Sequence, residues 1–304
     1  MVQTARHELH AAEIAALDNR VARWHVDRVS SPKFDQLQEL LRSFGSCVVA
    51  YSGGVDSALL ACVAGRVLGG KALAAIADSP SLPRRELEEA LAVGGQFGFQ
   101  VRVIQTQEFE NPAYLANPSN RCYFCKHELF TKLERLAQQE GFRVIAYGEN
   151  ASDIGDDRPG AKAAVEFEVR APLKELALTK AEIRTISSEL GLPTADKPEM
   201  PCLSSRIPHG EQVSTQKLLM IEQSESFLRD FGFRTVRVRH HEAEGGSLAR
   251  IELGIEELGR IKESQLPMEA VSALRKFGYS RVIVDPRGYR RGGARPVGSG
   301  LGLG

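Results

Sequence analysis

Three cysteines have the spacing that metal or sulfur chemistry requires. Cys122 and Cys125 form a Cys-x-x-Cys pair between Arg121 and Lys126, and Cys202 lies in a Pro-Cys-Leu-Ser-Ser-Arg segment farther along the chain. We expect the pair to lie in a loop just before a helix. There the helix N-terminus and the two cations would depress the pKa of the thiols, which favours thiolates as metal ligands and nucleophiles.

Several chemistries fit these cysteines. Three thiolates can hold three irons of a [4Fe–4S] cluster and leave the fourth iron open. A zinc site would need a fourth ligand, for which His127 and His209 are candidates. A dithiol redox pair is a third possibility, and plain structural cysteines are a fourth. The remaining two cysteines, Cys47 and Cys62, have apolar neighbours and are expected to be buried small hydrophobes.

A glycine-rich segment predicts a site for phosphate. It reads Ala-Tyr-Ser-Gly-Gly-Val-Asp-Ser, and it leads from an apolar strand through a turn into a helix, where unpaired backbone N–H groups gather around an anion. Gly53 and Gly54 allow close approach of the backbone. The hydroxyls of Ser52 and Ser57 can contact phosphate oxygens, and Asp56 is a candidate Mg²⁺ ligand. No lysine follows the glycines, so the loop of γ-phosphate transfer is absent; an ordinary strand-to-helix turn is the competing interpretation.

Strands and helices alternate in the part of the chain before residue 200. Apolar runs predict strands at residues 46–52, 72–79, 99–106 and 143–150, with helical segments between them. This order is typical of an α/β fold with a doubly wound parallel sheet, in which ligands bind at the carboxyl ends of the strands. The polar residues at those ends, candidates for contact with a nucleotide, are Asp78, Ser79, Glu149, Asn150 and Asp153.

The pattern changes after about residue 200 and predicts a smaller C-terminal α+β domain. A helix is expected at 215–231, followed by strands at 234–241, 248–253 and 280–285. Arg237 and Arg239 alternate along the first of these strands and should therefore point to the same side. We divide the chain into an N-terminal extension (1–34), an α/β domain with the glycine-rich loop (35–199), a second domain (200–292) and a flexible glycine-rich tail (293–304).

The composition excludes some classes of protein. The 304 residues include 39 Lys+Arg and 39 Asp+Glu, which argues against a broad polycationic surface for nucleic acid or lipid but permits a local basic pocket. No apolar run approaches the ~18–20 residues of a membrane span, and the charged N-terminus has no apolar signal segment. We therefore expect a cytoplasmic protein without nucleic-acid or membrane partners.

Eight segments, in order between about residues 35 and 292, match one enzyme family. They are VVAYSGGVDSALL, ADSPSLPRRELEEA, RCYFCKHELF, GENASDIGDDRPG, VRAPLKELALTKAEIR, GLPTADKPEMPCLSSRIPHG, VRVRHHEAEGGSLARIE and VDPRGYRRG. Through them the chain resembles the ATP-dependent sacrificial sulfur transferase family LarE, which makes the nickel-pincer nucleotide cofactor of lactate racemase. The first segment is similar to the pyrophosphate-binding loop, or PP-loop, of the N-type ATP pyrophosphatases.

The resemblance implies a two-step reaction. ATP adenylates a carboxylate of a small-molecule nucleotide, pyridinium-3,5-biscarboxylic acid mononucleotide, and a sulfur nucleophile then displaces AMP to leave a thiocarboxylate. In family members with one relevant cysteine, the residue at the position of Cys202 gives up its own sulfur and becomes dehydroalanine. Members with three cysteines bind a [4Fe–4S] cluster whose open iron is thought to carry the donor sulfide, and the presence of Cys122 and Cys125 favours this second route here.

The resemblance also implies further site residues and partners. Arg206, Arg237 and Arg239 match the phosphate- or substrate-binding arginines of the family, whose fork suits carboxylate and phosphate. The family reads N-A-D-D where this chain has serine at position 152, and Asp56 and Asp153 are the expected Mg²⁺ ligands. A homo-oligomer is expected, together with other enzymes of nickel-pincer biosynthesis as partners.

Two functions compete with this one. A tRNA thiolase of the same superfamily also joins such a loop to a three-cysteine cluster, but the neutral charge counts against it. A nucleotide-binding regulatory or scaffold protein would carry an inactive loop, which the intact Ser52, Asp56 and Ser57 disfavour.

Overall fold

The computed structural model describes residues 29, 31–153, 159–259, 261 and 266–290. Most of the predicted N-terminal extension and the whole predicted tail lie outside these residues. The extension does not reach residue 34, however, because helix α2 (Pro32–Phe44) already begins at Pro32, and proline is well suited to the first turn of a helix.

A four-stranded parallel sheet forms the N-terminal part, as the sequence predicts. The strands are β1 (Cys47–Ala50), β2 (Ala72–Asp78), β3 (Val101–Gln105) and β4 (Val144–Tyr147), in the order β3-β2-β1-β4. The helices of this part are α2, α3 (Val55–Leu68), α4 (Arg84–Phe97), α5 (Pro112–Leu115), α6 (Arg121–Glu140), α7 (Pro159–Glu166), α8 (Pro172–Glu175) and α9 (Lys180–Glu189).

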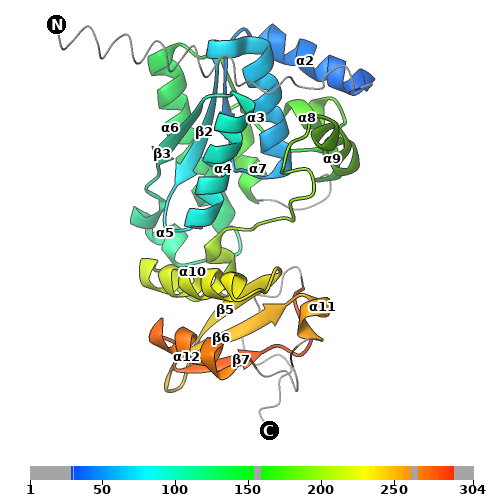
Figure 1. Ribbon diagram of the computed structural model, residues 1–304. Coiled ribbons are helices and arrows are strands. Elements are labelled where there is room, and N and C mark those ends of the chain that lie inside the picture. Colours follow the sequence, from blue (N-terminus) through cyan, green and yellow to red (C-terminus); the bar gives the residue numbers. More distant parts are fainter. Residues whose placement is uncertain (1–28, 30, 154–158, 260, 262–265, 291–304) are drawn as a thin grey trace, which may run out of the picture.

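Helices cover both faces of this sheet. Along β1, Cys47 and Val49 pack in one apolar cluster with α2, α3 and α9, whereas Val48 and Ala50 pack in another with α6 and α7. Successive side chains of a strand point to opposite faces, so a strand buried on both faces must be apolar throughout, as β1 is. Figure 1 shows α6 on one side of the sheet and α3 with α9 on the other. The doubly wound α/β architecture is confirmed.

The chain reverses its winding direction between β1 and β4. From β1 it proceeds to β2 and β3 on one side, and it then returns to form β4 on the other side of β1. Loops that follow two such neighbouring strands diverge and leave a crevice for ligands at the carboxyl edge of the sheet. The loop after β1 contains the glycine-rich segment, and the loop after β4 contains Glu149 and Asn150.

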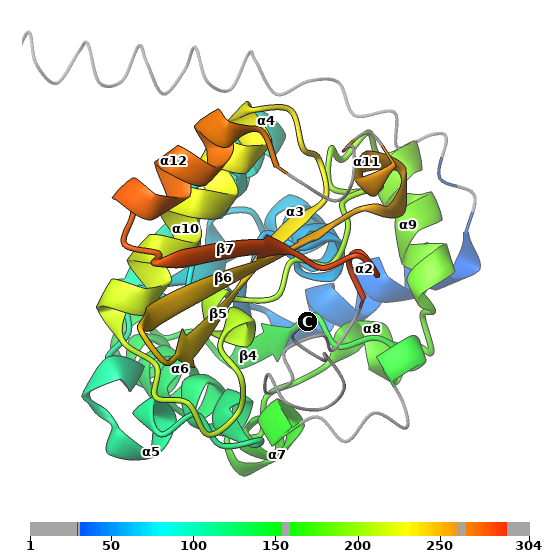
Figure 2. The ribbon, with the colours of Figure 1, turned by 90° about the horizontal axis from the view of Figure 1, so that it is seen from below.

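The C-terminal part contains a small mixed sheet with helices on one face. Strand β5 (Val236–Ala243) pairs antiparallel with β6 (Gly246–Leu253), which pairs parallel with β7 (Arg281–Val284). Val236, Val238 and Ile251 pack against the helices α10 (Thr215–Asp230) and α12 (Met268–Lys276), which lie side by side in Figure 2. A short helix, α11 (Ile255–Leu258), follows β6. The smaller α+β unit predicted from the sequence is therefore present.

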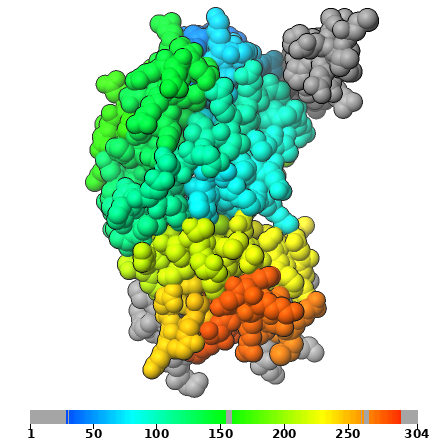
Figure 3. All heavy atoms as spheres, turned by 90° about the vertical axis from the view of Figure 1, so that its left-hand side faces the viewer, coloured from blue at the N-terminus to red at the C-terminus, as the bar shows by residue number. Residues whose placement is uncertain are grey.

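The carboxyl edge of the parallel sheet faces this C-terminal part. After β2, the carbonyl oxygen of Ser81 accepts a hydrogen bond from the Leu203 N–H (2.9 Å), and the Arg84 N–H donates to Glu222 Oε1 on α10 (2.5 Å). Figure 3 shows the two parts packed directly against each other. Within the described residues, no helix has the length and apolarity that crossing a membrane would require.

Candidate active site

The glycine-rich loop is held in shape by its own serines. Ser57 Oγ accepts a hydrogen bond from the Ser52 N–H (3.1 Å), donates to the Gly54 carbonyl (3.1 Å) and lies 3.0 Å from Ser52 Oγ. Gly53 has φ +72°, and a Cβ there would lie 3.0 Å from Ala90 Cβ, so two independent constraints require glycine. Helix α3 begins directly after Gly54 without a side-chain cap, which leaves the N–H groups of its first turn for an anion.

The loop after β4 approaches this helix end very closely. A Cβ on Gly148 would lie 2.8 Å from the Ser57 backbone nitrogen, so only glycine fits there. The buried Asn150 uses one amide nitrogen to reach two carboxylates: Nδ2 donates to Asp56 Oδ1 (3.2 Å) and to Asp153 Oδ2 (3.0 Å). The carboxylates of Asp56 and Asp153 therefore come together, although Asp56 lies in the first turn of α3 and Asp153 follows β4.

A lysine that the sequence analysis missed completes this group. Lys180, the first residue of α9, places Nζ 2.5 Å from Asp56 Oδ2. The motif Thr-Lys-Ala-Glu does predict a helix start, because Thr179 and Glu182 form a capping box. It gives no sign, however, of which group the lysine between them contacts.

The carboxylate pair fits a magnesium ion that is shared with phosphates. No group of three or more His, Cys, Asp or Glu side chains in the described residues is arranged as a metal site. Mg²⁺ at nucleotide sites needs only one or two carboxylates in addition to phosphate oxygens and water. Asp56 and Asp153 meet that requirement, whereas Glu149 is engaged elsewhere by Lys174 Nζ (2.9 Å) and the Tyr147 hydroxyl.

The polar residues after β2 bond to one another and to their own loop. Asp78 pairs with Arg84 (Oδ1 to Nη1, 2.6 Å) and accepts a hydrogen bond from Gln105 Nε2 (2.8 Å). Ser79 Oγ accepts from the Ser81 N–H (3.2 Å). Both residues lie at the carboxyl edge as predicted, with side chains that shape the loop.

The three candidate cysteines come together from two distant segments. Helix α6 begins at Arg121, so Cys122 and Cys125 lie in its first turn; the prediction of a loop before the helix was wrong. Their spacing of three residues places both on one helix face. Arg121 Nη1, beside Cys122, donates to the Ser204 carbonyl (3.0 Å), and Cys125 packs in one apolar cluster with Leu203, which follows Cys202; Cys122 and Cys202 are exposed. Cys47 and Cys62 are buried in the core, as expected.

The thiol pKa values shift in the direction opposite to the one expected. The pKa of the Cys125 thiol is raised to about 12, mainly by burial. The neighbouring Glu108 and Cys202 act in the same direction, and Lys126 acts in the opposite one. Burial and Cys202 also raise the pKa of Cys122, where they outweigh Arg121 and Lys126. The two cations are present, but desolvation exceeds their effect, so metal binding at these thiols must displace protons.

Neither histidine considered for a zinc site joins the cysteines in the described residues. His127 packs against the rings of Tyr123 and Phe167, with centroid distances of 5.8 and 5.0 Å. His209 lies exposed in the loop after Arg206. In the described part of the chain neither histidine joins the cysteines in a metal-binding group. The three thiols likewise form no ready metal-binding group among the described residues.

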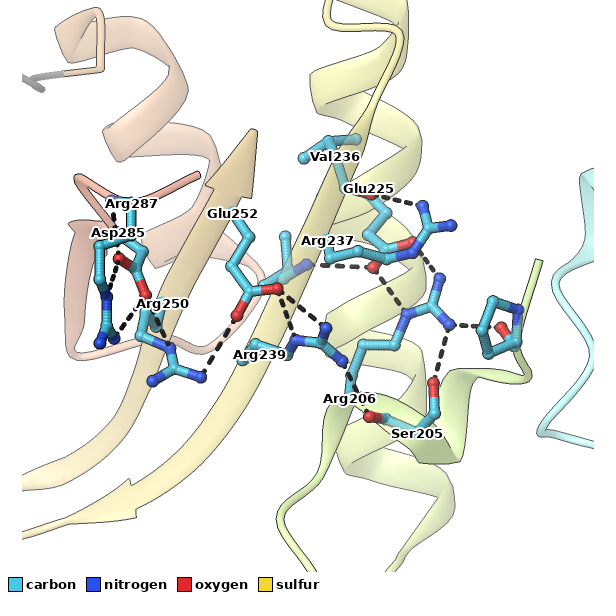
Figure 4. A network of polar contacts seen from close by, with 12 residues as sticks. Ser205, Arg206, Glu225, Val236, Arg237, Arg239, Arg250, Glu252, Asp285 and Arg287 are labelled. Carbon is cyan, nitrogen blue, oxygen red and sulfur yellow. Dashed lines mark hydrogen bonds and ion pairs between the residues drawn. The ribbon is translucent and has the colours of Figure 1, made fainter. Parts of the chain in front are cut away.

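Arg206 occupies a different position from that of a substrate ligand. Its side chain is 0% exposed, and Nε and Nη2 donate to the two carboxylate oxygens of Glu225 at 2.9 and 3.0 Å (Figure 4). Nη1 donates to the carbonyl oxygens of Pro201 and Cys202, the latter at 3.0 Å. These contacts occupy the guanidinium, which thereby fixes the backbone around Cys202. A role of Arg206 in binding an anionic ligand therefore stays a prediction, and an anion there would have to compete with Glu225.

Arg237 and Arg239 share one face of β5, as their alternation predicts, and both are buried. Arg239 pairs with Glu252 on β6 (Nη2 to Oε2, 2.8 Å) and donates to the Ser205 carbonyl (3.0 Å). Arg237 donates to the Glu199 carbonyl (3.3 Å) and lies over the Tyr289 ring at 5.2 Å. Figure 4 shows this charged face beside Ser205 and Arg206, where an anion would have to compete with protein partners.

Comparison with known proteins gives a consistent group of relatives. The family model for NAD synthase matches residues 34–117. The chain is 44% identical to an uncharacterized protein of Synechocystis sp. over 86% of this chain and 96% of that protein. It is 30% identical to the pyridinium-3,5-bisthiocarboxylic acid mononucleotide synthase of Lactiplantibacillus plantarum, over 83% of this chain and 90% of that protein. An uncharacterized protein of Methanocaldococcus jannaschii is 27% identical over 80% of this chain and 90% of its own length.

Proposed function

The chain belongs to the family of PP-loop ATP pyrophosphatases that includes the pyridinium-3,5-bisthiocarboxylic acid mononucleotide synthase, and from this premise we propose that it is an ATP-dependent sulfur transferase. Its substrate would be pyridinium-3,5-biscarboxylic acid mononucleotide, whose carboxylates become thiocarboxylates for the nickel-pincer nucleotide. The observation that supports the proposal is that Arg121, next to Cys122, donates to the carbonyl of Ser204, two residues after Cys202. This places the two cysteine segments side by side at the edge of the sheet that carries the glycine-rich loop.

In the first step a substrate carboxylate oxygen attacks the α-phosphorus of ATP, and pyrophosphate leaves. The N–H groups of the first turn of α3 and the hydroxyls of Ser52 and Ser57 bind the pyrophosphate. Asp56 and Asp153 would hold Mg²⁺. Without a metal, Lys180 neutralises Asp56. Once Mg²⁺ replaces Lys180 beside Asp56, the charge of Lys180 becomes available to a phosphate oxygen. The carboxylate acquires AMP as a leaving group, which it lacks by itself.

In the second step a sulfur nucleophile attacks the activated acyl carbon, AMP leaves, and a thiocarboxylate remains. Cys122, Cys125 and Cys202 would hold a [4Fe–4S] cluster, which supplies an iron without a protein ligand where sulfide can bind. The exposure of Cys122 and Cys202 gives a nucleotide access to the sulfur site. Without a cluster, Cys202 itself would be the donor, through a thioester whose cleavage leaves dehydroalanine.

Anaerobic purification of the full-length chain tests both halves of this proposal. With ATP, the pyridinium mononucleotide and sulfide, we expect AMP and a thiocarboxylate product by mass spectrometry. Iron and acid-labile sulfide should be present in the wild type, lost in Cys125→Ser and retained in Cys62→Ala, a matched cysteine outside the group. Iron-free protein with full activity would contradict the cluster, and loss of the Cys202 sulfur after turnover would establish the sacrificial route. No AMP formation with this substrate would refute the proposed function.

A further inference from the structure

A closed ring of three buried hydroxyls lies two residues beyond Cys202. Ser204 Oγ is 2.7 Å from Ser81 Oγ and 2.9 Å from Tyr114 Oη, and Ser81 Oγ is 2.6 Å from Tyr114 Oη. The three side chains are 0%, 4% and 1% exposed, in the order Ser204, Ser81 and Tyr114. Each hydroxyl has one hydrogen to donate, so three hydroxyls can satisfy the three contacts in a cycle. We call this group the hydroxyl ring.

The backbone of Ser204 is bonded on its other side to the helix of the Cys-x-x-Cys pair. Arg121, the first residue of α6, donates from Nη1 to the Ser204 carbonyl (3.0 Å) and to Asn117 Oδ1. Asn117 is fully buried and donates from Nδ2 to the carbonyl oxygens of Ile207 (3.3 Å) and Pro208 (2.7 Å). One short segment, 204–208, is therefore fixed to the start of α6 by several buried bonds.

The hydroxyl ring lies beside the thiols themselves. The Tyr114 hydroxyl interacts electrostatically with Cys202 and Cys125. Leu203 and Ile207, which flank the ring, pack in one apolar cluster with Tyr114 and the partly buried Cys125. Ser81 belongs to the loop after β2, and its carbonyl accepts the N–H of Leu203 (2.9 Å). The ring thus joins three segments at the point where the cysteine loop crosses from one part of the molecule to the other.

We propose that Ser204 is a positioning residue that, through the hydroxyl ring and Arg121, holds the Cys202 thiol within reach of Cys122 and Cys125. The inference rests on the proposed function only in assuming that the three thiols act together. Removing one hydroxyl leaves two buried hydroxyls with an incomplete cycle, so the segment loses its preferred position. Arg206 Nη1 still holds the Cys202 carbonyl (3.0 Å), but the Cys202 side chain itself is exposed.

Disulfide trapping in the full-length chain, after removal of metals with a chelator, measures this position directly. Diamide takes two electrons and two protons from a thiol pair and becomes the hydrazine, so its reaction reports how often Cys202 meets Cys122 or Cys125. Peptide mapping identifies the bond. Ser204→Ala and Tyr114→Phe each remove one ring hydroxyl. The matched control is Ser187→Ala, a fully buried serine whose hydroxyl has no partner within the described residues.

We expect the disulfide to form about tenfold more slowly in Ser204→Ala and Tyr114→Phe, and at the wild-type rate in Ser187→Ala, with unchanged circular dichroism. Iron uptake after anaerobic reconstitution should fall in the same two variants. Wild-type trapping rates in both ring variants would overturn the inference, and so would an equal slowing in Ser187→Ala, because the effect would then be general loosening. A wild type that traps the disulfide but takes up no iron would contradict the cluster of the proposed function, while slowed trapping in the ring variants would still support the role of Ser204.

Discussion

Replacing Arg206 with methionine separates two roles for this side chain. The family resemblance predicts a ligand for the substrate anion, whereas the structure pairs the guanidinium with Glu225 through two hydrogen bonds of 2.9 and 3.0 Å. The two side chains are 0% and 1% exposed. Loss of a substrate ligand would raise KM and leave folding unchanged, but loss of a buried ion-pair partner should destabilise the C-terminal part.

The expected loss follows from what Arg206→Met leaves behind. Glu225 keeps hydrogen bonds from Arg229 Nη2 and the Val238 N–H, both at 3.0 Å, but loses the cation that approaches both of its oxygens. Removing one partner of a buried pair typically costs ~3–5 kcal/mol. Since Arg229 still compensates part of the charge, we expect the lower end, about 3 kcal/mol. For a chain of this size that corresponds to a fall in melting temperature of about 6–12 °C.

Thermal unfolding followed by circular dichroism measures this loss, and two further variants control it. Arg85→Met breaks an ion pair with Asp230 whose side chains are 43% and 63% exposed, so it should cost less than about 1 kcal/mol. In the double variant Arg206→Met/Glu225→Leu the buried carboxylate is removed as well. Arg229, whose side chain is 14% exposed, and the Val238 N–H then lose this partner, so only part of the stability should return. If Arg206→Met melted within about 2 °C of the wild type and only KM rose, the buried-pair argument would fail and the ligand role would be restored.

Three further predictions concern other parts of the molecule. Lys180→Met removes the cation 2.5 Å from Asp56 and should weaken ATP binding, measured by calorimetry, about tenfold. Lys33 bonds Glu182 (2.8 Å) and the Ala177 carbonyl (2.7 Å), so an equal effect of Lys33→Met would contradict this local explanation. Gly148→Ala brings a Cβ within 2.8 Å of the Ser57 nitrogen and should also reduce ATP affinity, whereas Gly95→Ala, with open space inside α4, should stabilise the protein by about 0.5–1 kcal/mol. The pKa of His241 is lowered from 6.5 to about 4, first by burial and then by the neighbouring Arg250, His240 and Arg239. As pH falls from 6.5 to 4, His241 therefore takes up a proton in the unfolded chain but not in the native chain. The free energy of unfolding should decline across that window by up to ~3 kcal/mol. If the pH slope of the urea midpoint were unchanged in His241→Gln, this assignment would be refuted.

Local patterns predicted the fold well because they depend on neighbouring residues. The four parallel strands coincide with the apolar runs, and the reversal at β1 places the glycine-rich loop at the carboxyl edge, as the strand order implies. The start of α6 was mispredicted, since Cys122 and Cys125 were expected before the helix. Asn120 occupies the N-cap position, but its side chain makes no capping hydrogen bond, so the usual signal for a helix start is weak here.

Partners across long sequence distances could not be predicted. Three such pairs join segments whose mutual placement depends on how the chain packs: Asp56 with Lys180, Arg206 with Glu225, and Ser81 with Ser204. The alternation of Arg237 and Arg239 correctly gave their common face, but alternation does not reveal the register of β6. That register places Glu252 opposite Arg237, and from there it pairs with Arg239. A pattern of types and spacings identifies which residues can do chemistry, while their charges and hydrogen bonds are decided by the neighbours that the fold supplies.

The loop after β2 connects the two halves of the proposed reaction. An acyl adenylate reacts with water unless the sulfur nucleophile is close by when it forms, so the nucleotide loops and the cysteines must be held together before ATP is consumed. Ser79 and Ser81 lie two residues apart in this loop, and Ser81 bonds both the backbone of Leu203 and the hydroxyl of Ser204. If ATP binds at residues 52–57, which follow the adjacent strand β1, the cysteine loop is already fixed beside it through buried contacts. The sulfur site then needs no large domain movement to reach the adenylate, and any variant that loosens Ser81 should release AMP without forming thiocarboxylate.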